Sequence, residues 1–373
     1  MTTSVDLFLQ TASQCLCPPG DGVFTVNTAK ERKALLRAEL FGQDADVRAE
    51  WLAGLQRFAG SAESAAILGI SSDCGGGILR GANWGPLFLR LALLQQQRQS
   101  YPADLGDIRV IPHLLHDKYL NAETITNCRQ ALYQNALADL PVSPLSLTEQ
   151  LADLFYQAFP GKGIFGIGGD HSVSYPLTKA YLKARRTAGI RTAIIHFDAH
   201  TDLLTERLGI DLCFGSWCTH ILEFLPAPSH LIQLGIRSSG KPKSHWESTF
   251  GVRQFWADEI RSLGAVAVAE AIVTQLKAAV VDELYVSFDI DALDAEYAAA
   301  TGTPETGGMT PDEALQILAI LQQHFRVGAA DMMEIAPFTD STGQGAASSA
   351  QTLKVGAELS AVLLDAISRD PAR

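Results

Sequence analysis

The sequence predicts an α/β fold in which helices cover both faces of a mainly parallel sheet. Short, almost continuous apolar runs, such as residues 192–197, alternate with helical patterns along most of the chain. Strands that are buried on both faces read as such runs, whereas half-exposed strands alternate between apolar and polar residues. Charged motifs follow directly after three of the runs, and ligands bind at that edge of open parallel sheets.

The individual elements follow from the same patterns. Strands are predicted at residues 65–71, 108–111, 163–167, 192–197, 230–236, 283–288 and 327–335. Helices are predicted at 86–97, 121–137, 147–159, 175–186, 265–279, 311–325 and 347–368. Residues 1–60 are predicted to form an N-terminal extension, with a loop around 17–22 and a charged helical stretch from about 28 to 58.

Composition sets limits on partners and location. The net charge is −12 and the sequence has no basic stripe, so neither nucleic acid nor a membrane surface is an expected partner. No apolar run approaches the roughly 18 residues of a membrane span, and no signal peptide is evident. Six cysteines lack disulfide or zinc-ribbon spacing, which indicates reduced thiols and a cytoplasmic protein.

Three short segments carry side chains that commonly bind metal ions. They read Gly-Gly-Asp-His-Ser at 168–172, Asp-Ala-His-Thr-Asp at 198–202 and Ser-Phe-Asp-Ile-Asp at 287–291. Residues two apart face the same side of an extended strand, so the alternating side chains of the last two segments point into one pocket. Taken singly, each segment also suits a polar loop, a tight turn or a helix cap. Together they predict a site for two divalent cations, held by His171, Asp198, His200, Asp202, Asp289 and Asp291.

In this order and spacing, the three motifs resemble those of the ureohydrolase (arginase/agmatinase) family. Residues 81–90 also resemble the helix that follows the family's first strand, and residues 331–335 resemble its last sheet segment. The resemblance covers roughly residues 65–370 and implies a three-layer α/β/α arginase-like fold around a parallel sheet of about eight strands. Residues 61–373 are therefore expected to form a ureohydrolase catalytic domain, with the extension 1–60 largely outside it.

The resemblance also implies a cofactor and a division of the ligands. Family members usually hold two Mn²⁺ ions, and the same ligand set suits Ni²⁺, which some guanidine-cleaving branches use. The usual assembly is a trimer or hexamer of identical chains. In the family's pattern, Asp198 and Asp289 bridge the two ions, His171 and Asp202 complete the shell of one, and His200 and Asp291 complete that of the other.

The reaction that the resemblance implies is hydrolysis of a guanidino or amidino C–N bond. A hydroxide that bridges the two metal ions would attack the guanidinium carbon, and the intermediate would release urea and an amine. Glu334 matches the family's glutamate that pairs with the guanidinium, a role that suits a fixed carboxylate facing a planar cation. The expected catalytic residues are Asp291, Glu334 and, for proton transfer, His220.

The sequence departs from the family pattern at Phe214, where arginases and agmatinases carry a histidine. A phenyl ring cannot transfer a proton, so His220 or a metal-bound water is the alternative source, although a packed or exposed role also suits His220. Phe214 and Trp217 predict an apolar-walled pocket, and both rings also suit a core position. Such a pocket favours free guanidine, alkylguanidine, a guanidino acid or agmatine over L-arginine.

Two alternative functions remain open from the sequence. A formiminoglutamate hydrolase would need an arginine for the substrate carboxylate, and Arg80 and Arg237 each follow a predicted strand. A non-catalytic family member acting as a subunit of a mixed oligomer is the other alternative, and Phe214 favours it. The complete ligand set and Glu334 oppose that reading.

Overall fold

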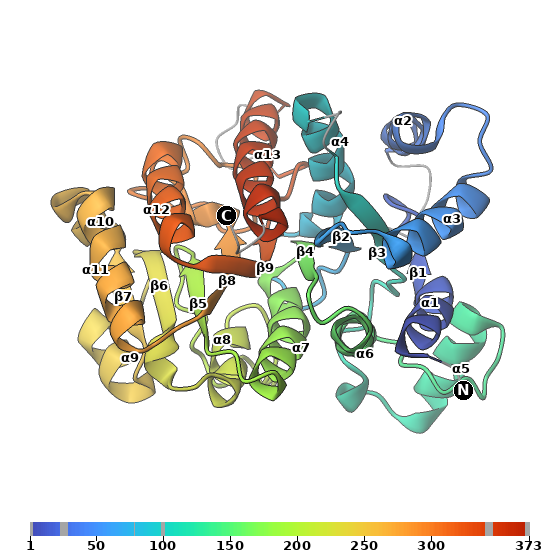
Figure 1. Ribbon diagram of the computed structural model, residues 1–373, viewed down its shortest axis with the longest axis horizontal. Helices are drawn as coiled ribbons and strands as arrows, with labels where there is room; N and C mark the ends of the chain where they lie inside the picture. The colour runs from blue at the N-terminus through green and yellow to red at the C-terminus, as the bar shows by residue number, and fades with distance from the viewer. Residues whose placement is uncertain (1–2, 23–28, 78, 98–100, 340–345, 370–373) are drawn as a thin grey trace.

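The centre of the molecule is one sheet whose strands are almost all parallel. A computed structural model describes residues 3–22, 29–77, 79–97, 101–339 and 346–369. The strands within them are β1 (Leu16–Cys17), β2 (Ala65–Ile70), β3 (Ala103–Ile108), β4 (Gly163–Gly168), β5 (Thr192–Phe197), β6 (Leu231–Ile236), β7 (Arg253–Trp256), β8 (Glu283–Asp289) and β9 (Arg326–Met333). They lie in the order β1-β3-β2-β4-β9-β8-β5-β6-β7 (Figure 1). Strands β2 to β9 run parallel to their neighbours, and β1 is antiparallel to β3.

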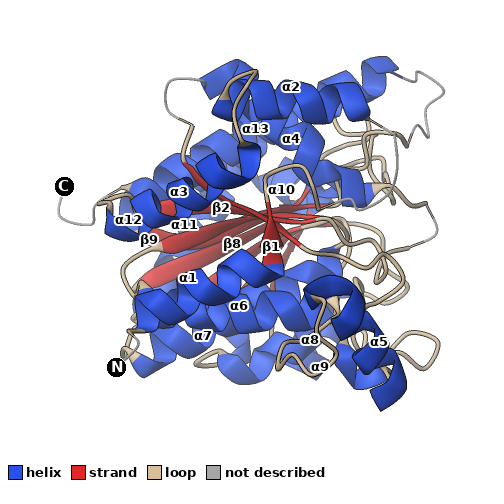
Figure 2. Ribbon diagram, turned by 90° about the vertical axis from the view of Figure 1, so that its right-hand side faces the viewer, coloured by secondary structure: helices blue, strands red, loops and turns tan. Residues whose placement is uncertain are grey.

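Helices cover both faces of this sheet, which confirms the predicted three-layer α/β/α fold (Figure 2). One face is covered mainly by α4 (Gly85–Gln97), α11 (Ala265–Ala278), α12 (Pro311–His324) and α13 (Ala346–Ser368). The opposite face is covered mainly by α1 (Ser4–Cys15), α6 (Pro144–Ala158), α7 (Ser174–Thr187) and α8 (Trp217–Ile221). The remaining helices are α2 (Lys30–Phe41), α3 (Val47–Gly60), α5 (Ala122–Tyr133), α9 (Lys243–Phe250) and α10 (Ala257–Leu263).

The predicted strands agree with the structure wherever the sequence has a continuous apolar run. The strand predicted at 108–111 is wrong, because β3 ends at Ile108 and carries Asp104 and Asp107, which interrupt its apolar pattern. Strands β1 and β7 were not predicted. They lie at the two edges of the sheet and are only two and four residues long, too short to give a periodic signal.

The N-terminal segment is packed onto the sheet rather than separate from it. Helix α1 lies against α6, where the ring of Phe8 contacts Phe155 and Phe159 edge-on at centroid distances of 5.7 and 5.3 Å. The charged stretch expected from 28 to 58 forms two helices, α2 and α3, and α1 was not predicted. Residues 1–2 and 23–28 of the predicted extension lie outside the described residues. The domain boundary at residue 60 stays a prediction.

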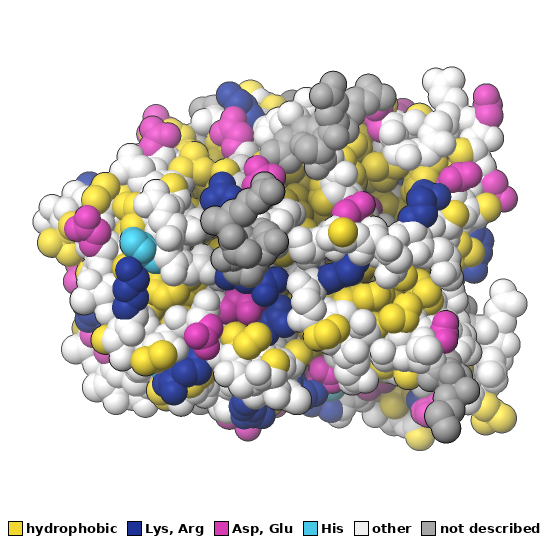
Figure 3. All heavy atoms as spheres, viewed as in Figure 1, with side chains coloured by type: hydrophobic (Ala, Val, Ile, Leu, Met, Phe, Trp, Pro, Cys, Tyr) yellow, Lys and Arg dark blue, Asp and Glu magenta, His cyan; other side chains and the backbone are white. Residues whose placement is uncertain are grey.

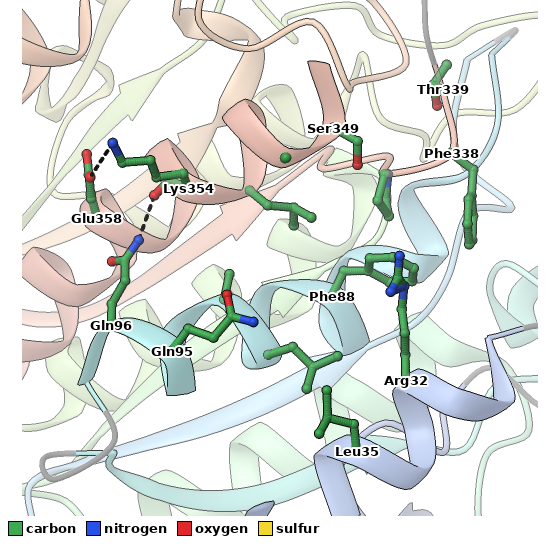
Figure 4. A pocket seen from close by; sticks show the side chains of 15 residues that line it. Arg32, Leu35, Phe88, Gln95, Gln96, Phe338, Thr339, Ser349, Lys354 and Glu358 are labelled. Atoms are coloured by element: carbon green, nitrogen blue, oxygen red, sulfur yellow. Dashed lines mark hydrogen bonds and ion pairs between the residues drawn. The ribbon is translucent and has the colours of Figure 1, made fainter. Parts of the chain in front are cut away.

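A cavity of about 720 Å³ lies between α2, α4 and α13, beside the segment that follows β9 (Figure 4). Its walls are mainly apolar, and Arg32 lies over the ring of Phe88 at 4.6 Å from the centroid. On the molecular face in Figure 3, acidic, basic and apolar side chains are interspersed. Among the described residues, no helix is both long and apolar enough to cross a bilayer.

Candidate metal centre

The predicted metal ligands lie together at one edge of the sheet. His171 follows β4, Asp198 and His200 follow β5, and Asp289 ends β8. Because β4, β9, β8 and β5 are neighbouring parallel strands, their carboxyl ends deliver these side chains to the same place. We call the six side chains His171, Asp198, His200, Asp202, Asp289 and Asp291 the ligand cluster.

One half of the ligand cluster is centred on His171. Its Nδ1 atom lies 3.1 Å from Asp198 Oδ2, 3.3 Å from Asp202 Oδ2 and 3.1 Å from Asp289 Oδ2. All four side chains are buried. Three carboxylate oxygens and one imidazole nitrogen therefore converge at one buried point.

The other half is centred on His200, which is half-buried. Its Nδ1 atom lies 3.3 Å from Asp198 Oδ1 and 3.2 Å from Asp291 Oδ2. Asp198 thus turns Oδ2 toward His171 and Oδ1 toward His200. A carboxylate in this arrangement could bridge two neighbouring divalent cations, as carboxylates do in two-metal hydrolases.

Hydrogen bonds behind His171 place a hydrogen on Nε2 and turn Nδ1 toward the carboxylates. The hydroxyl of Ser287 donates to Asp331 Oδ1 at 2.8 Å, so its oxygen accepts from His171 Nε2, which is 3.0 Å away. Nδ1 is buried and has no hydrogen-bond partner among the described residues. Although burial opposes it, Asp198 and Asp289 raise the pKa of His171 well above its usual value, so a proton on Nδ1 holds these carboxylates without metal. A divalent ion in the same place would replace that proton, and the donor set of one imidazole and three carboxylates fits such an ion.

The electrostatics of the ligand cluster lead to the same conclusion. Burial, together with the neighbouring carboxylates, raises the pKa of Asp202 and Asp289 well above the usual value for aspartate. Burial and the charge of Asp289 likewise raise the pKa of Glu334. The site therefore holds protons that groups in water would release at neutral pH, and divalent ions would take the place of those protons.

Neighbouring donors fix the ligand carboxylates in place. Trp217 Nε1 donates to Asp202 Oδ2 at 2.8 Å, and Thr303 Oγ1 donates to Asp291 Oδ2 at 2.9 Å. Asp202 also has a φ angle of +50°, in the left-handed region that non-glycine residues rarely adopt. Strain of this kind persists at sites where the surrounding structure holds a functional side chain.

Glu334 lies beside the ligand cluster, directly after β9. Its Oε1 accepts from the main-chain N–H of His171 at 2.9 Å, and its own N–H donates to the carbonyl of Gly169. Its φ angle of +63° is also left-handed. A Cβ atom placed on Gly302 would lie 3.5 Å from Oε2, so glycine keeps the approach to this oxygen open.

Phe214 lies at the rim of the site. Its main-chain N–H donates to the carbonyl of Gly75, whose own N–H donates to Asp170 Oδ2 at 3.1 Å. A Cβ atom on Gly77 would lie 3.6 Å from the Phe214 ring and 3.9 Å from the methyl group of Thr303. Phe214 is therefore near Thr303, the residue that holds Asp291.

Two other predicted site residues lie away from the rim. Trp217 is fully buried, and its ring lies 5.0 Å from that of His171, so it contacts the ligands from behind. His220 Nε2 donates to the main-chain carbonyl of Asp211 at 2.7 Å. Its ring also lies 6.1 Å from that of Tyr175.

The two arginines considered for a substrate carboxylate differ sharply. Arg237 donates to six main-chain carbonyls around the loops that follow β6 and β8, among them those of Asp291 and Leu293. Its guanidinium is therefore occupied in fixing the ligand loop. Arg80 is exposed on the loop after β2.

Sequence reasoning missed the buried side chains that support the ligands. Ser287 precedes Asp289 by two residues, and His196 precedes Asp198 by two. His196 Nε2 lies 2.9 Å from Asp198 Oδ2. The alternation of side chains along a strand places such residues on the same face as the ligand, and this signal was available in the sequence.

Comparison with known proteins adds an independent result. The family model described as Arginase family matches residues 63–362. The mitochondrial guanidino acid hydrolase of Homo sapiens is 30% identical over 305 residues, which cover 78% of this chain and 76% of that protein. The mitochondrial agmatinase of Gallus gallus is 30% identical over 298 residues, 76% of each chain. The structure of proclavaminate amidino hydrolase from Streptomyces clavuligerus has the same fold, with a TM-score of 0.61 and 24% identity over 82% of this chain and 92% of that one.

Proposed function

The chain belongs to the arginase family, and we propose that it hydrolyses a small guanidino compound at a site for two divalent metal ions. It is a metal-dependent amidinohydrolase that cleaves a guanidino C–N bond. The observation that carries the proposal is the Nδ1 atom of His171, buried within 3.3 Å of three carboxylate oxygens. That arrangement fits a hydrolytic metal centre better than a structural ion pair.

The ligand assignment is part of this proposal. Asp198 and Asp289 would bridge the ions, and the other four side chains of the ligand cluster would complete the two shells. When bound, two divalent ions lower the pKa of water toward neutrality and so supply a nucleophile for an unreactive carbon. Mn²⁺ is the ion we propose first, since carboxylates with a few imidazoles suit it, and Ni²⁺ is the second.

The residues of the chain would orient the substrate and move its protons. The Glu334 carboxylate, held by the N–H of His171, would accept hydrogen bonds from the planar guanidinium and fix it in one orientation. The carboxyl group of Asp291 would accept a proton during attack and return one to the departing nitrogen. Overall, a guanidinium R–NH–C(NH₂)₂⁺ and water become R–NH₃⁺ and urea. His220 fits this proton transfer less well because its Nε2 hydrogen is donated to Asp211.

For the substrate we propose a small guanidino acid. Arg207 lies over the ring of Phe214, with its guanidinium carbon 5.0 Å from the centroid. The exposed Arg207 is held at the rim by paired main-chain hydrogen bonds with Ile210. Its position suits the carboxylate of a short guanidino acid, and one relative is a guanidino acid hydrolase.

A carboxylate on the other side of the rim supports a competing substrate. Glu305 Oε1 lies 3.6 Å from His200 Nε2 and is partly exposed. It suits the distant ammonium of agmatine, and another relative is an agmatinase. Free guanidine and alkylguanidines would use neither group. Arg237 is fully engaged with main-chain carbonyls, so formiminoglutamate would depend on Arg207 for its carboxylate, as a guanidino acid would.

The test is urea release from a panel of guanidines by protein loaded separately with Mn²⁺ and Ni²⁺. The panel contains guanidinoacetate, guanidinopropionate, guanidinobutyrate, agmatine, guanidine, methylguanidine and arginine, with formamide release followed for formiminoglutamate. A guanidino acid should be preferred, and Arg207→Gln should raise its KM about tenfold or more while sparing guanidine. Preference for agmatine, sensitive to Glu305→Gln instead, would replace the substrate assignment.

The same panel distinguishes an enzyme from a non-catalytic subunit. Two bound ions without turnover would indicate an amidine outside the panel. No turnover and no bound metal would instead make the chain a subunit of a mixed oligomer. We also propose a cytoplasmic homo-oligomer, a trimer or hexamer, in which residues 61–373 form the catalytic domain and residues 1–60 an extension.

A further inference from the structure

A row of buried polar side chains runs across three strands from the ligand cluster to the edge of the sheet. His196, Gln233 and Gln254 lie side by side on β5, β6 and β7, in register with one another. None of the three is exposed to solvent. Trp256, two residues after Gln254, ends the row at the edge strand.

At the end of the row near the ligands, a main-chain carbonyl fixes the direction in which the hydrogen bonds run. Gln233 Nε2 lies 2.6 Å from the carbonyl oxygen of Thr201, which can only accept a hydrogen bond. The amide nitrogen of Gln233 must therefore face this carbonyl. Its second hydrogen then points to His196 Nδ1, 2.9 Å away, which must accept it.

At the far end of the row, Trp256 independently fixes the same direction of hydrogen bonding. Trp256 Nε1 can only donate, and it donates to Gln254 Oε1 at 2.9 Å. Gln254 Nε2 therefore faces Gln233 Oε1, at 2.8 Å. This again turns the nitrogen of Gln233 toward His196, so both ends of the row require one arrangement.

The consequence for His196 is a defined tautomer. With Nδ1 accepting, a neutral His196 carries its hydrogen on Nε2 and donates it to Asp198 Oδ2 at 2.9 Å. The Cys218 thiol, 3.6 Å from Nδ1, is a weak donor to the same lone pair. Neither ring nitrogen then has a lone pair free for a cation.

This conclusion differs from what proximity alone suggests. Donor atoms of His196 lie within 4.8 Å of those of His171, Asp198 and Asp202, close enough to be counted as a four-ligand set. The two histidines nevertheless differ in what fixes the nitrogen that faces the carboxylates. His171 Nδ1 has only the carboxylates near it, whereas the row of amides makes His196 Nε2 an N–H donor to Asp198.

We propose that His196 is a positioning residue that holds the bridging carboxylate of Asp198, and that Gln233, Gln254 and Trp256 keep it out of metal coordination. The proposal rests on the metal site of the proposed function. When Asp198 Oδ2 accepts the N–H bond of His196, a second lone pair on that oxygen remains for one ion. Asp198 Oδ1 remains for the other ion. Supporting hydrogen bonds of this kind set ligand orientation and contribute about 10–100-fold to metal affinity or activity.

A matched pair of substitutions tests the role of each ring nitrogen. Glutamine places an amide nitrogen near the position of Nε2, whereas asparagine reaches only the position of Nδ1. We expect His196→Gln to bind two Mn²⁺ ions with affinities within a few-fold of wild type, and His196→Asn to bind at least one ion about 10–100-fold more weakly by calorimetry. His230→Asn is the control, since His230 is buried and neither ring nitrogen has a partner among the described residues.

Two results would overturn the proposal. One is a His196→Gln variant that loses a bound ion as completely as the His171→Gln variant does, which would make His196 a ligand. The other is unchanged affinity in His196→Asn, which would make its hydrogen bond irrelevant. If wild-type protein binds no metal, the proposed function fails, and the tautomer is then tested separately.

The tautomer can be read without metal. In metal-free protein with labelled histidine, the ring ¹⁵N and ¹³C shifts of His196, assigned by its loss in His196→Gln, should report hydrogen on Nε2. Gln233→Leu removes the donor to Nδ1 and should shift this resonance toward a mixture of tautomers. A wild-type His196 with hydrogen on Nδ1 would contradict the row's polarity, whatever the protein catalyses.

Discussion

Two groups of buried charges lie on opposite sides of strand β4, and they satisfy their charges in different ways. The first, the Arg90 cluster, consists of Arg90, Asp104 and Asp107 between α4 and β3. The second is the ligand cluster. Both are largely shielded from water, but only in the first does an arginine guanidinium pair with the carboxylates.

In the Arg90 cluster every charged group is matched within the protein. Arg90 donates to Asp104, Asp107 and the carbonyls of Pro86 and Gly106. The remaining oxygen of Asp107 accepts from the N–H groups of Gly20 and Gly22, which ties the N-terminal segment to β3. In the ligand cluster, by contrast, a single histidine nitrogen faces three carboxylates. Complete internal matching indicates a structural role, and the unmatched excess of acid indicates a site for cations.

The largest expected effect is on catalysis, from Asp198→Ala. This substitution removes the carboxylate that faces both halves of the ligand cluster, so kcat/KM should fall about a thousandfold or more. Urea release at saturating metal measures it, with Asp153→Ala, a surface partner of Lys183, as the control. Retention of more than a tenth of the activity would contradict a bridging role.

The next effect is on stability, from Arg90→Met. Removing one partner of a buried ion group leaves the carboxylates of Asp104 and Asp107 unpaired, and the free energy of unfolding should fall by about 3–5 kcal/mol. Urea denaturation measures this change. Lys354→Met, which breaks an exposed pair with Glu358, should change it by less than about 0.5 kcal/mol. Similar small values for both variants would remove the distinction between buried and exposed pairs.

The two clusters should differ most clearly in whether metal reverses the sign of a mutant's change in the free energy of unfolding. In chelator-treated protein, Asp289→Asn removes one of several repelling buried carboxylates and should raise the free energy of unfolding by about 1–2 kcal/mol. With saturating Mn²⁺ the same variant should be less stable than wild type, because it has lost a ligand. Asp107→Asn should destabilise the protein by a similar amount in both conditions. The absence of any dependence on metal at Asp289 would argue against coordination there.

The smallest effect comes from an exposed group, Asp211. Although burial opposes it, hydrogen bonds from Lys118 and Tyr119 lower the pKa of this carboxyl from 3.8 to about 2. A lowered pKa stabilises the folded protein above the unfolded value, and this stability is lost as the pH falls from about 4 to about 2. Because the pair with Lys118 is exposed, the loss should be below about 1 kcal/mol. Thermal unfolding of wild type and Asp211→Asn across this range measures it, and equal pH dependence would contradict the contact.

The sequence predicted those parts of the molecule that follow from local pattern. Continuous apolar runs predicted the central strands, and the acids and histidines that follow them predicted the ligand cluster. Strand β3 was misplaced because Asp104 and Asp107 interrupt its apolar pattern, although Arg90, a residue of α4, pairs with both in the fold. Sequence patterns do not reveal such partners, since they arise only when distant segments meet.

The same limit applies within the site. Phe214 was placed near the pocket by its departure from a family pattern, but Arg207 above its ring was not anticipated. Trp217 was expected on the pocket wall, whereas its indole N–H is bound to Asp202. The tautomers of His171 and His196 depend on hydroxyl and amide groups of neighbouring strands, and only the assembled sheet defines those contacts.

The most direct test of the metal centre is anomalous diffraction from crystals of the Mn²⁺-loaded protein. We expect two peaks about 3.5–4 Å apart within the ligand cluster, one beside His171 and one beside His200, with Asp198 between them. His196 should lie outside both coordination shells. A single peak, a peak coordinated by His196, or no peak in protein that nevertheless releases urea would contradict the two-metal centre proposed for this chain.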